Sequence, residues 1–150
     1  MSTGLGNAGE VIRVVVEPNT LVVIAGTATG GSYTQRVTVM SSDKQWLLSG
    51  NNTVLMLDGA GEPVLTFPPR AEKAAFILLF EAAKPEGDFF DAEVAPDYKA
   101  NKHVIDGFAT YYTFHSEDGG DRDFNDCTLS VALIAATKSG AITEPIVQYK

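Results

Sequence analysis

Short apolar runs separated by turn-forming residues constrain this chain more than any other feature. Segments rich in Val, Ile, Thr, Phe and Tyr recur between clusters of Gly, Pro, Asn and Asp, and helical periodicity is nearly absent. This pattern is typical of an antiparallel sandwich rather than of a parallel α/β sheet. We therefore predict an all-β protein, an antiparallel β-sandwich, with strands near residues 10–17, 20–28, 33–40, 53–57, 63–67, 75–81, 102–115 and 127–136.

Two of these segments indicate how they are buried. Successive side chains of a strand point to opposite faces, so the strand after residue 126 has one apolar face, formed by Cys127, Leu129, Val131 and Leu133. The continuous apolar run at residues 76–80 favours a central strand covered on both faces. Residues 82–102 mix Pro, Gly and acids, and we expect a long loop there with at most one short strand or helical turn.

Composition and charge limit the partners, metal sites and location that this chain can have. With 150 residues, 45% of them hydrophobic, the chain suits one domain over residues 1–150. The net charge is −8 and the 11 basic residues are scattered, which argues against nucleic acid and membrane surfaces as partners. Cys127 is the only cysteine, so an internal disulfide and a thiolate zinc site are excluded. Neither a signal peptide nor a membrane span is recognisable, and we expect a protein that is cytoplasmic or exported without a conventional signal peptide.

A dense acidic segment lies between two predicted strands. Residues 116–126 read Ser-Glu-Asp-Gly-Gly-Asp-Arg-Asp-Phe-Asn-Asp, and they include five carboxylates, those of Glu117, Asp118, Asp121, Asp123 and Asp126. Like charges held this close raise their pKa values, spread into water or are neutralised by a cation. Calcium suits the segment better than magnesium, because it accepts about six to eight oxygen ligands in flexible geometry. We therefore predict a calcium site, with a solvated acidic turn as the alternative.

The segment differs from two common calcium loops. If Asp121 is counted as the first residue of an EF-hand loop, Asp126 falls where the invariant glycine belongs and Ala132 where the bidentate glutamate belongs. The Gly-Gly-x-Gly-x-Asp repeat of calcium-binding β-rolls is also absent. Charge counting favours two adjacent ions, because one divalent cation leaves the five carboxylates at about −3 and two leave them near −1.

Residues 116–126 resemble the calcium-binding loop of the fucose-binding lectin II family, bacterial lectins in which two neighbouring calcium ions coordinate sugar hydroxyls directly. A weaker similarity covers Pro18-Asn19-Thr20, the small-residue turn at residues 29–32 and the strand at residues 35–39. The resemblance implies a sandwich that binds a neutral monosaccharide such as fucose or mannose through calcium. It also implies a homo-oligomer, because linking weak single sites raises the effective affinity.

The resemblance further implies a role for each residue of the site. It makes calcium ligands of the side chains of Glu117, Asp121, Asp123, Asn125 and Asp126, and it assigns one carbonyl ligand to Thr29. It makes Asp118 a carboxylate that contacts the sugar. It also implies that the turn which sets sugar preference consists of Gly30, Gly31 and Ser32.

The chain departs from the family pattern after its last predicted strand. In the family, the chain ends soon after the last aspartate, and its terminal carboxylate completes the metal site of a neighbouring subunit. This chain continues to Lys150. The alternative hypothesis is a calcium-stabilised structural or adhesin-type β-domain, in which the acidic segment pins strands together and binds no sugar. The additional residues favour this alternative if they cover the segment.

Catalytic interpretations are weaker than binding ones. His115 and Ser116 are neighbours on one strand, so they cannot assemble a nucleophile with its base. Cys127 falls on the apolar face of its strand, where an inert buried thiol is the usual occupant. A pair of glycosidase carboxylates needs two separate environments, which one contiguous loop supplies poorly. We therefore predict that the protein is not an enzyme. Tyr111 and Tyr112 could stack on a sugar, although such residues more often lie in a core.

Overall fold

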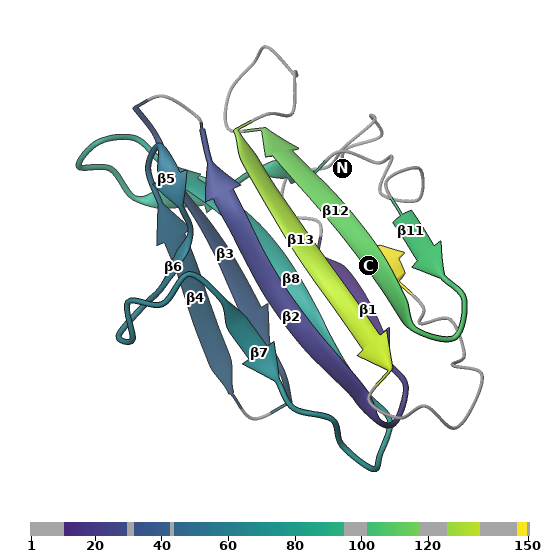
Figure 1. Ribbon diagram of the computed structural model, residues 1–150. Coiled ribbons are helices and arrows are strands. Elements are labelled where there is room, and N and C mark those ends of the chain that lie inside the picture. The colour runs from purple at the N-terminus through teal and green to yellow at the C-terminus, as the bar shows by residue number, and fades with distance from the viewer. Residues whose placement is uncertain are drawn as a thin grey trace.

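Two antiparallel β-sheets face each other in the computed structural model, which describes residues 11–29, 32–42, 44–94, 102–117, 126–135 and 147–149. Figure 1 shows one sheet lying in front of the other, with their long strands running in similar directions. The prediction of an all-β antiparallel sandwich is therefore confirmed. No described segment forms a helix long and apolar enough to cross a membrane.

The first sheet, called sheet A, is built around a ten-residue strand. Its order is β14 (Val147–Tyr149), β1 (Ile12–Val16), β8 (Ala74–Ala83), β3 (Thr34–Met40), β4 (Gln45–Gly50) and β6 (Met56–Leu57), and β9 (Phe89–Asp91) also pairs with β8. The apolar run at residues 76–80 is central, as predicted, because β8 pairs with β1 on one side and β3 on the other. The prediction that both faces are covered is wrong. Phe76, Leu78 and Phe80 are buried, whereas Ile77 and Leu79 on the outer face stay partly exposed.

The second sheet, called sheet B, contains the two strands that flank the acidic segment. Its order is β10 (Glu93–Val94), β12 (Ala109–Glu117), β13 (Cys127–Ala135), β2 (Thr20–Ala28) and β5 (Thr53–Val54). Two further strands extend its edges: β11 (Lys102–Ile105) pairs with β12, and β7 (Leu65–Phe67) pairs with β2. The segment predicted as one strand over residues 102–115 is thus a hairpin. It reverses at Gly107, whose φ of 76° lies in the left-handed region that glycine tolerates.

Alternating side chains build the core between the sheets. The predicted apolar face of β13 is confirmed, because Cys127, Leu129, Val131 and Leu133 are all at most 1% exposed. Phe114 from β12 approaches Phe80 from β8 across the interface, with ring centroids 6.4 Å apart. Burial of such apolar area is the main favourable term in folding.

The chain passes from one sheet to the other at Leu55. The segment predicted as one strand over residues 53–57 is divided here, because β5 pairs with β2 in sheet B and β6 pairs with β4 in sheet A. Leu55 itself is fully buried, and its amide donates to the carbonyl of Gly26 at 2.9 Å. A side chain that points into the core at the crossing therefore joins the two layers.

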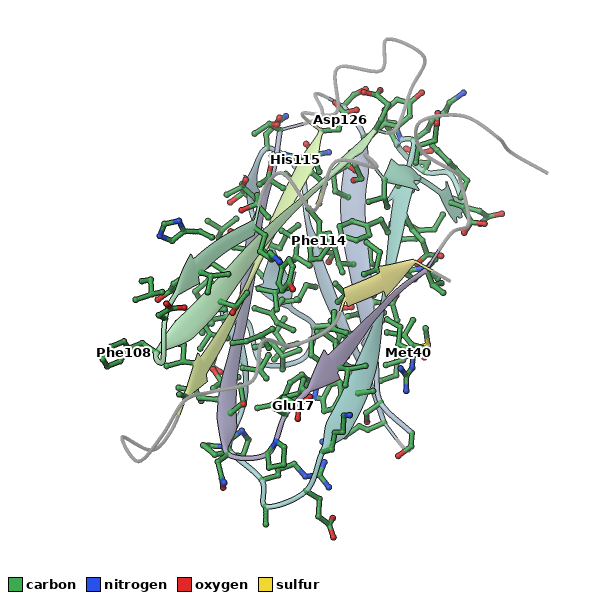
Figure 2. The ribbon with its side chains drawn as sticks, turned by 90° about the vertical axis from the view of Figure 1, so that its right-hand side faces the viewer. Glu17, Met40, Phe108, Phe114, His115 and Asp126 are labelled. Carbon is green, nitrogen blue, oxygen red and sulfur yellow. The ribbon has the colours of Figure 1, made fainter. Side chains whose placement is uncertain are left out.

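Strand polarity gives the sandwich two distinct ends. β2 and β12 finish at the end where β13 begins, which we call the loop end (Figure 1). β2 begins at the other end, which we call the far end. Figure 2 shows Asp126 at the loop end and Glu17 at the far end.

Candidate functional site

Three neighbouring strands of sheet B meet at the same level at the loop end. In register, Ser116 of β12 lies opposite Cys127 of β13, and Cys127 lies opposite Ala28 of β2. Each strand adds one more residue beyond this row, which brings together Glu117, Asp126 and Thr29. The sheet therefore places residues about 90 positions apart in the sequence side by side.

Backbone hydrogen bonds continue past the last paired residues. The amide of Thr29 donates to the carbonyl of Asp126 at 2.8 Å, and the amide of Asp126 donates to the carbonyl of Ser116 at 3.2 Å. Both bonds hold residue 126 between its two neighbours. The predicted association of Thr29 with the end of the acidic segment is therefore observed in the backbone, although its role as a carbonyl ligand stays a prediction.

Two acidic side chains at the loop end are buried. Glu117 is 3% exposed and Asp126 is 8% exposed, and they begin and end the segment that contains the other predicted ligands. A buried carboxylate is costly unless it is paired, hydrogen-bonded or bound to a metal. Both residues take part in polar interactions within the protein. Their oxygen atoms are nevertheless the type of ligand that calcium prefers, so the residues present fit this ion.

A third acid, missed in the sequence, lies beside this pair. Glu93 on β10 is paired in register with Glu117 on β12. Directly opposed residues of antiparallel strands have Cβ atoms roughly 4.5–5.5 Å apart, so two acidic residues are adjacent here. Residues 82–102 contain no strong strand pattern and were predicted to form a loop. The sequence therefore held no signal for this pairing.

The remaining predicted site residues fall into two groups. Ser32 is described: it is exposed, and its carbonyl accepts a hydrogen bond from Nδ2 of Asn51 at 3.2 Å. The others lie outside the described residues and include Gly30, Gly31, Asp118, Asp121, Asp123 and Asn125. Within the described part of the chain, no group of three or more His, Cys, Asp or Glu side chains is arranged to hold a metal ion.

The thiol of Cys127, next to the acidic segment, is unreactive. Burial raises the pKa of the Cys127 thiol to about 12, and the negative charge of Asp126 acts in the same direction. The thiol therefore stays protonated at neutral pH, which makes it a poor nucleophile and a poor metal ligand. The nearby His115 faces Thr128 instead, with Nδ1 3.2 Å from the Thr128 hydroxyl.

Among the described residues, aromatic side chains do not gather into one platform at the loop end. Tyr112 is 3% exposed and stacks on Phe114 in the core, with centroids 6.0 Å apart, whereas Tyr111 points outward beside His103. The predicted tyrosine pair is therefore split between two faces. Phe90, on β9 of sheet A, contacts Tyr33 edge to face at a centroid distance of 6.1 Å.

One comparison with known proteins identifies a family. The model of the family described as "Fucose-binding lectin II (PA-IIL)" matches residues 14–134 of this chain. These residues include the acidic segment and the turn at residues 29–32. They also include every described strand in full except β1, which the match enters at Val14, β13, which ends one residue beyond it, and β14, which lies outside it. A search of curated protein sequences finds no match to this chain.

Solved structures of bacterial lectins share the fold. The Ralstonia solanacearum high-affinity mannose-binding lectin is similar with a TM-score of 0.53 and 16% identity, over 80% of this chain and 93% of that one. The C-terminal domain of the BC2L-C lectin from Burkholderia cenocepacia is similar with a TM-score of 0.51 and 13% identity, over 85% of this chain and 96% of that one. At such identities the likeness establishes the architecture.

Proposed function

From the premise that this chain belongs to the fucose-binding lectin II family and is a carbohydrate-binding lectin, we propose that it binds a neutral monosaccharide through calcium held at the loop end. The observation that carries this proposal is the burial of Glu117 and Asp126 at the two ends of the acidic segment. Buried acids next to a segment rich in further carboxylates supply the oxygen ligands that a divalent cation binds. Family members are calcium-dependent, which supports the same assignment.

The proposed ligand set combines residues at the ends of strands with residues of the segment that connects them. Glu117 and Asp126 are the last and first residues of the β12–β13 connection, and Asp121, Asp123 and Asn125 lie within it. Thr29, tied to Asp126 through the backbone, supplies a carbonyl. Calcium, when bound, supplies open positions that take sugar hydroxyls in exchange for water. The charge of five carboxylates favours two ions.

The sugar is oriented by groups around the metal site. Asp118 accepts hydrogen bonds from sugar hydroxyls, and such charge-assisted bonds are short and directional. The turn of Gly30, Gly31 and Ser32 discriminates between sugars by its contacts with the bound ring. Fucose and mannose are the proposed sugars, because the family is described as fucose-binding and the similar Ralstonia protein as mannose-binding. No chemical step is proposed, since the family is one of lectins rather than enzymes.

Calorimetric titration with fucose and mannose tests this proposal, first in calcium and then after chelation. Binding heat that disappears on chelation is the expected result. Asp123→Ala should abolish both calcium and sugar binding, whereas Asp118→Ala should weaken sugar binding and retain calcium. Asp106→Ala is a matched control, because this exposed carboxylate lies in the β11–β12 turn. Calcium binding without any sugar heat would instead support the structural calcium domain.

The alternative structural role is favoured if the C-terminal extension covers the acidic segment. The described part of that extension, β14, pairs with β1 at the edge of sheet A, whereas the acidic segment begins and ends on sheet B. Residues 147–149 therefore do not support such a cover. We further propose that the lectin forms a homo-oligomer, since joined sites compensate for weak single ones. Light scattering of the purified protein measures its mass directly.

A further inference from the structure

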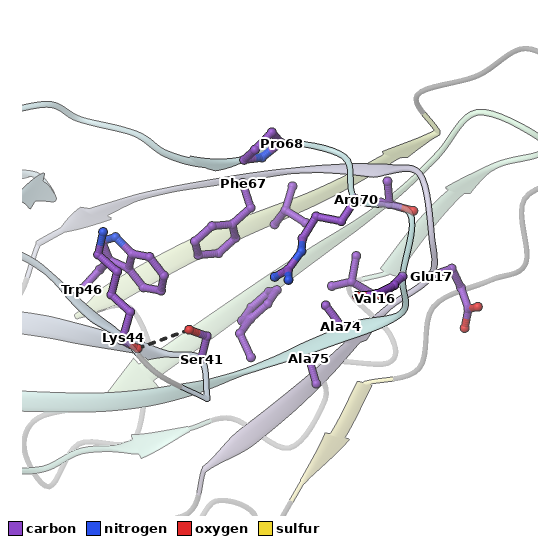
Figure 3. Close-up of a pocket in the computed structure, with 14 residues that line it drawn as sticks. Val16, Glu17, Ser41, Lys44, Trp46, Phe67, Pro68, Arg70, Ala74 and Ala75 are labelled. Atoms are coloured by element: carbon purple, nitrogen blue, oxygen red, sulfur yellow. Dashed lines mark hydrogen bonds between the residues drawn. The ribbon is translucent and has the colours of Figure 1, made fainter.

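A cavity opens between the two sheets at the far end of the sandwich. It has a volume of about 370 Å³ and is lined by residues from the end of β1, the start of β2 and β8, and the turn between β3 and β4 (Figure 3). β2 separates it from the acidic segment, and nine strand residues span roughly 26–30 Å. The cavity is thus a separate place in the fold from the proposed sugar site.

Three aromatic rings form one wall of this cavity. Trp46 contacts Phe67 with ring centroids 4.8 Å apart, and Phe67 lies 5.7 Å from Phe76. Trp46 and Phe67 pack against the core but remain only partly buried, because their other sides face the cavity. Cavities of roughly 300–1,000 Å³ with aromatic walls and a few polar groups are the usual form of small-molecule sites.

The polar groups around the cavity are unevenly placed. Figure 3 shows the Arg70 side chain extending into the space beside Phe67, and it shows the Glu17 carboxylate pointing away. Glu17 is also 3.8 Å from the ammonium group of Lys73, which offsets its charge. Lys44 lies over the Trp46 ring at 5.3 Å, and Glu72 is the other acid of the lining. A planar guanidinium beside aromatic rings is suited to binding a carboxylate with two hydrogen bonds.

We propose that this cavity binds a small amphipathic carboxylate, whose apolar body lies against Trp46, Phe67 and Phe76 while its carboxylate accepts hydrogen bonds from the Arg70 guanidinium. The rings supply apolar area that gains free energy when a ligand displaces water. Arg70 orients the ligand with its acid group at the cavity opening. The proposal does not depend on calcium or on sugar binding.

The chain carries its own reporter for this site, because Trp46 is its only tryptophan. We would titrate the protein with octanoate and separately with 1-octanol, which has the same number of carbon atoms but no charge, and follow the fluorescence of Trp46. Octanoate should produce a saturable change at lower concentration than 1-octanol. The absence of a saturable change with octanoate, or equal affinity for the two ligands, would overturn the proposal.

Matched variants locate the binding site. Arg70→Gln should weaken octanoate binding about tenfold, the loss expected for a hydrogen bond to a charged group, and leave 1-octanol binding unchanged. Lys84→Gln is the control, since it removes one exposed positive charge near the loop end. Ala74 shares the inner face of β8 with Phe76, so Ala74→Leu fills the cavity and should weaken both ligands. Urea denaturation of each variant verifies that it is folded. Octanoate binding that is unaffected by both Arg70→Gln and Ala74→Leu in folded protein would refute this location.

Discussion

Replacing Gly26 by alanine tests how closely β2 approaches β13 and Leu55 near the point where the chain changes sheets. A Cβ atom at this position would lie 2.5 Å from the carbonyl oxygen of Thr128 and 2.9 Å from Cδ1 of Leu55. The first contact is with backbone of the paired strand β13, which cannot rotate away as a side chain can. Gly26→Ala should therefore force β2 and β13 apart locally or displace Leu55.

The magnitude follows from two opposing effects. Overpacking of this kind costs about 1–3 kcal/mol, and alanine recovers about 0.4–1 kcal/mol by restricting the unfolded chain. We expect a net loss of about 1–2 kcal/mol in the free energy of unfolding, which lowers the Tm of a protein of this size by roughly 2–8 °C. Urea denaturation followed by fluorescence, together with calorimetry, measures both quantities.

Gly87→Ala is the matched control for this experiment. The same methyl group there would meet the carbonyl oxygen of Lys84 at 3.3 Å, in an exposed turn that can adjust. Its free energy of unfolding should change by less than about 0.5 kcal/mol, as is usual for surface substitutions. A Gly26→Ala protein as stable as the wild type would refute the argument that β2 lies too close to β13 and Leu55 here for a side chain.

Three further predictions concern other parts of the molecule. Leu129→Ala, at a fully buried position of β13, should cost about 2–5 kcal/mol in urea denaturation, because it removes core contacts and leaves a cavity. The Cys127 thiol should resist alkylation in the folded protein at pH 8 and react when the protein is unfolded in urea, as measured by mass spectrometry. The pKa of this thiol is raised from 9.0 to about 12 in the folded state, so between pH 9 and 12 only the unfolded chain releases the proton. The free energy of unfolding should therefore fall as the pH rises through this range, and Cys127→Ala should lessen that fall. Arg36→Ala should lower the Tm more at low salt than at high salt, because the Arg36 guanidinium is 2.9 Å from the Glu81 carboxylate and 3.7 Å from the centre of the Phe89 ring. Equal decreases in Tm at both salt concentrations would argue against an electrostatic contribution.

The parts of the fold that could be predicted from the sequence are those with local alternation or strong turn residues. β2 was predicted with its observed bounds, and the buried face of β13 followed from the spacing of Cys127, Leu129 and Val131. β4 was missed because Trp46, Leu47 and Leu48 are consecutive, so their apolar character gives no period of two. The crossing at Leu55 depends on packing between distant strands, which no local pattern records.

The candidate site shows a similar division. The density of acids at residues 117–126 was visible in the sequence, and the family resemblance identified the partner turn that begins at Thr29. The adjacency of Thr29 to Asp126 arises from the register of β2 with β13, and register is set by the burial of one whole face of each strand. Glu93 could not be found, because its position opposite Glu117 depends on a two-residue strand that pairs only in the folded protein.

The pairing of β14 with β1 has a consequence for how copies of this lectin can meet. An open strand edge can accept a strand from another molecule, which is a common route to association. Here the chain's own end occupies that edge at Ile12 to Val14. A tethered segment competes at an effective concentration in the millimolar range, far above that of a neighbouring molecule in dilute solution. Exchange of strands at β1 is therefore suppressed, and the proposed homo-oligomer should form through other surfaces.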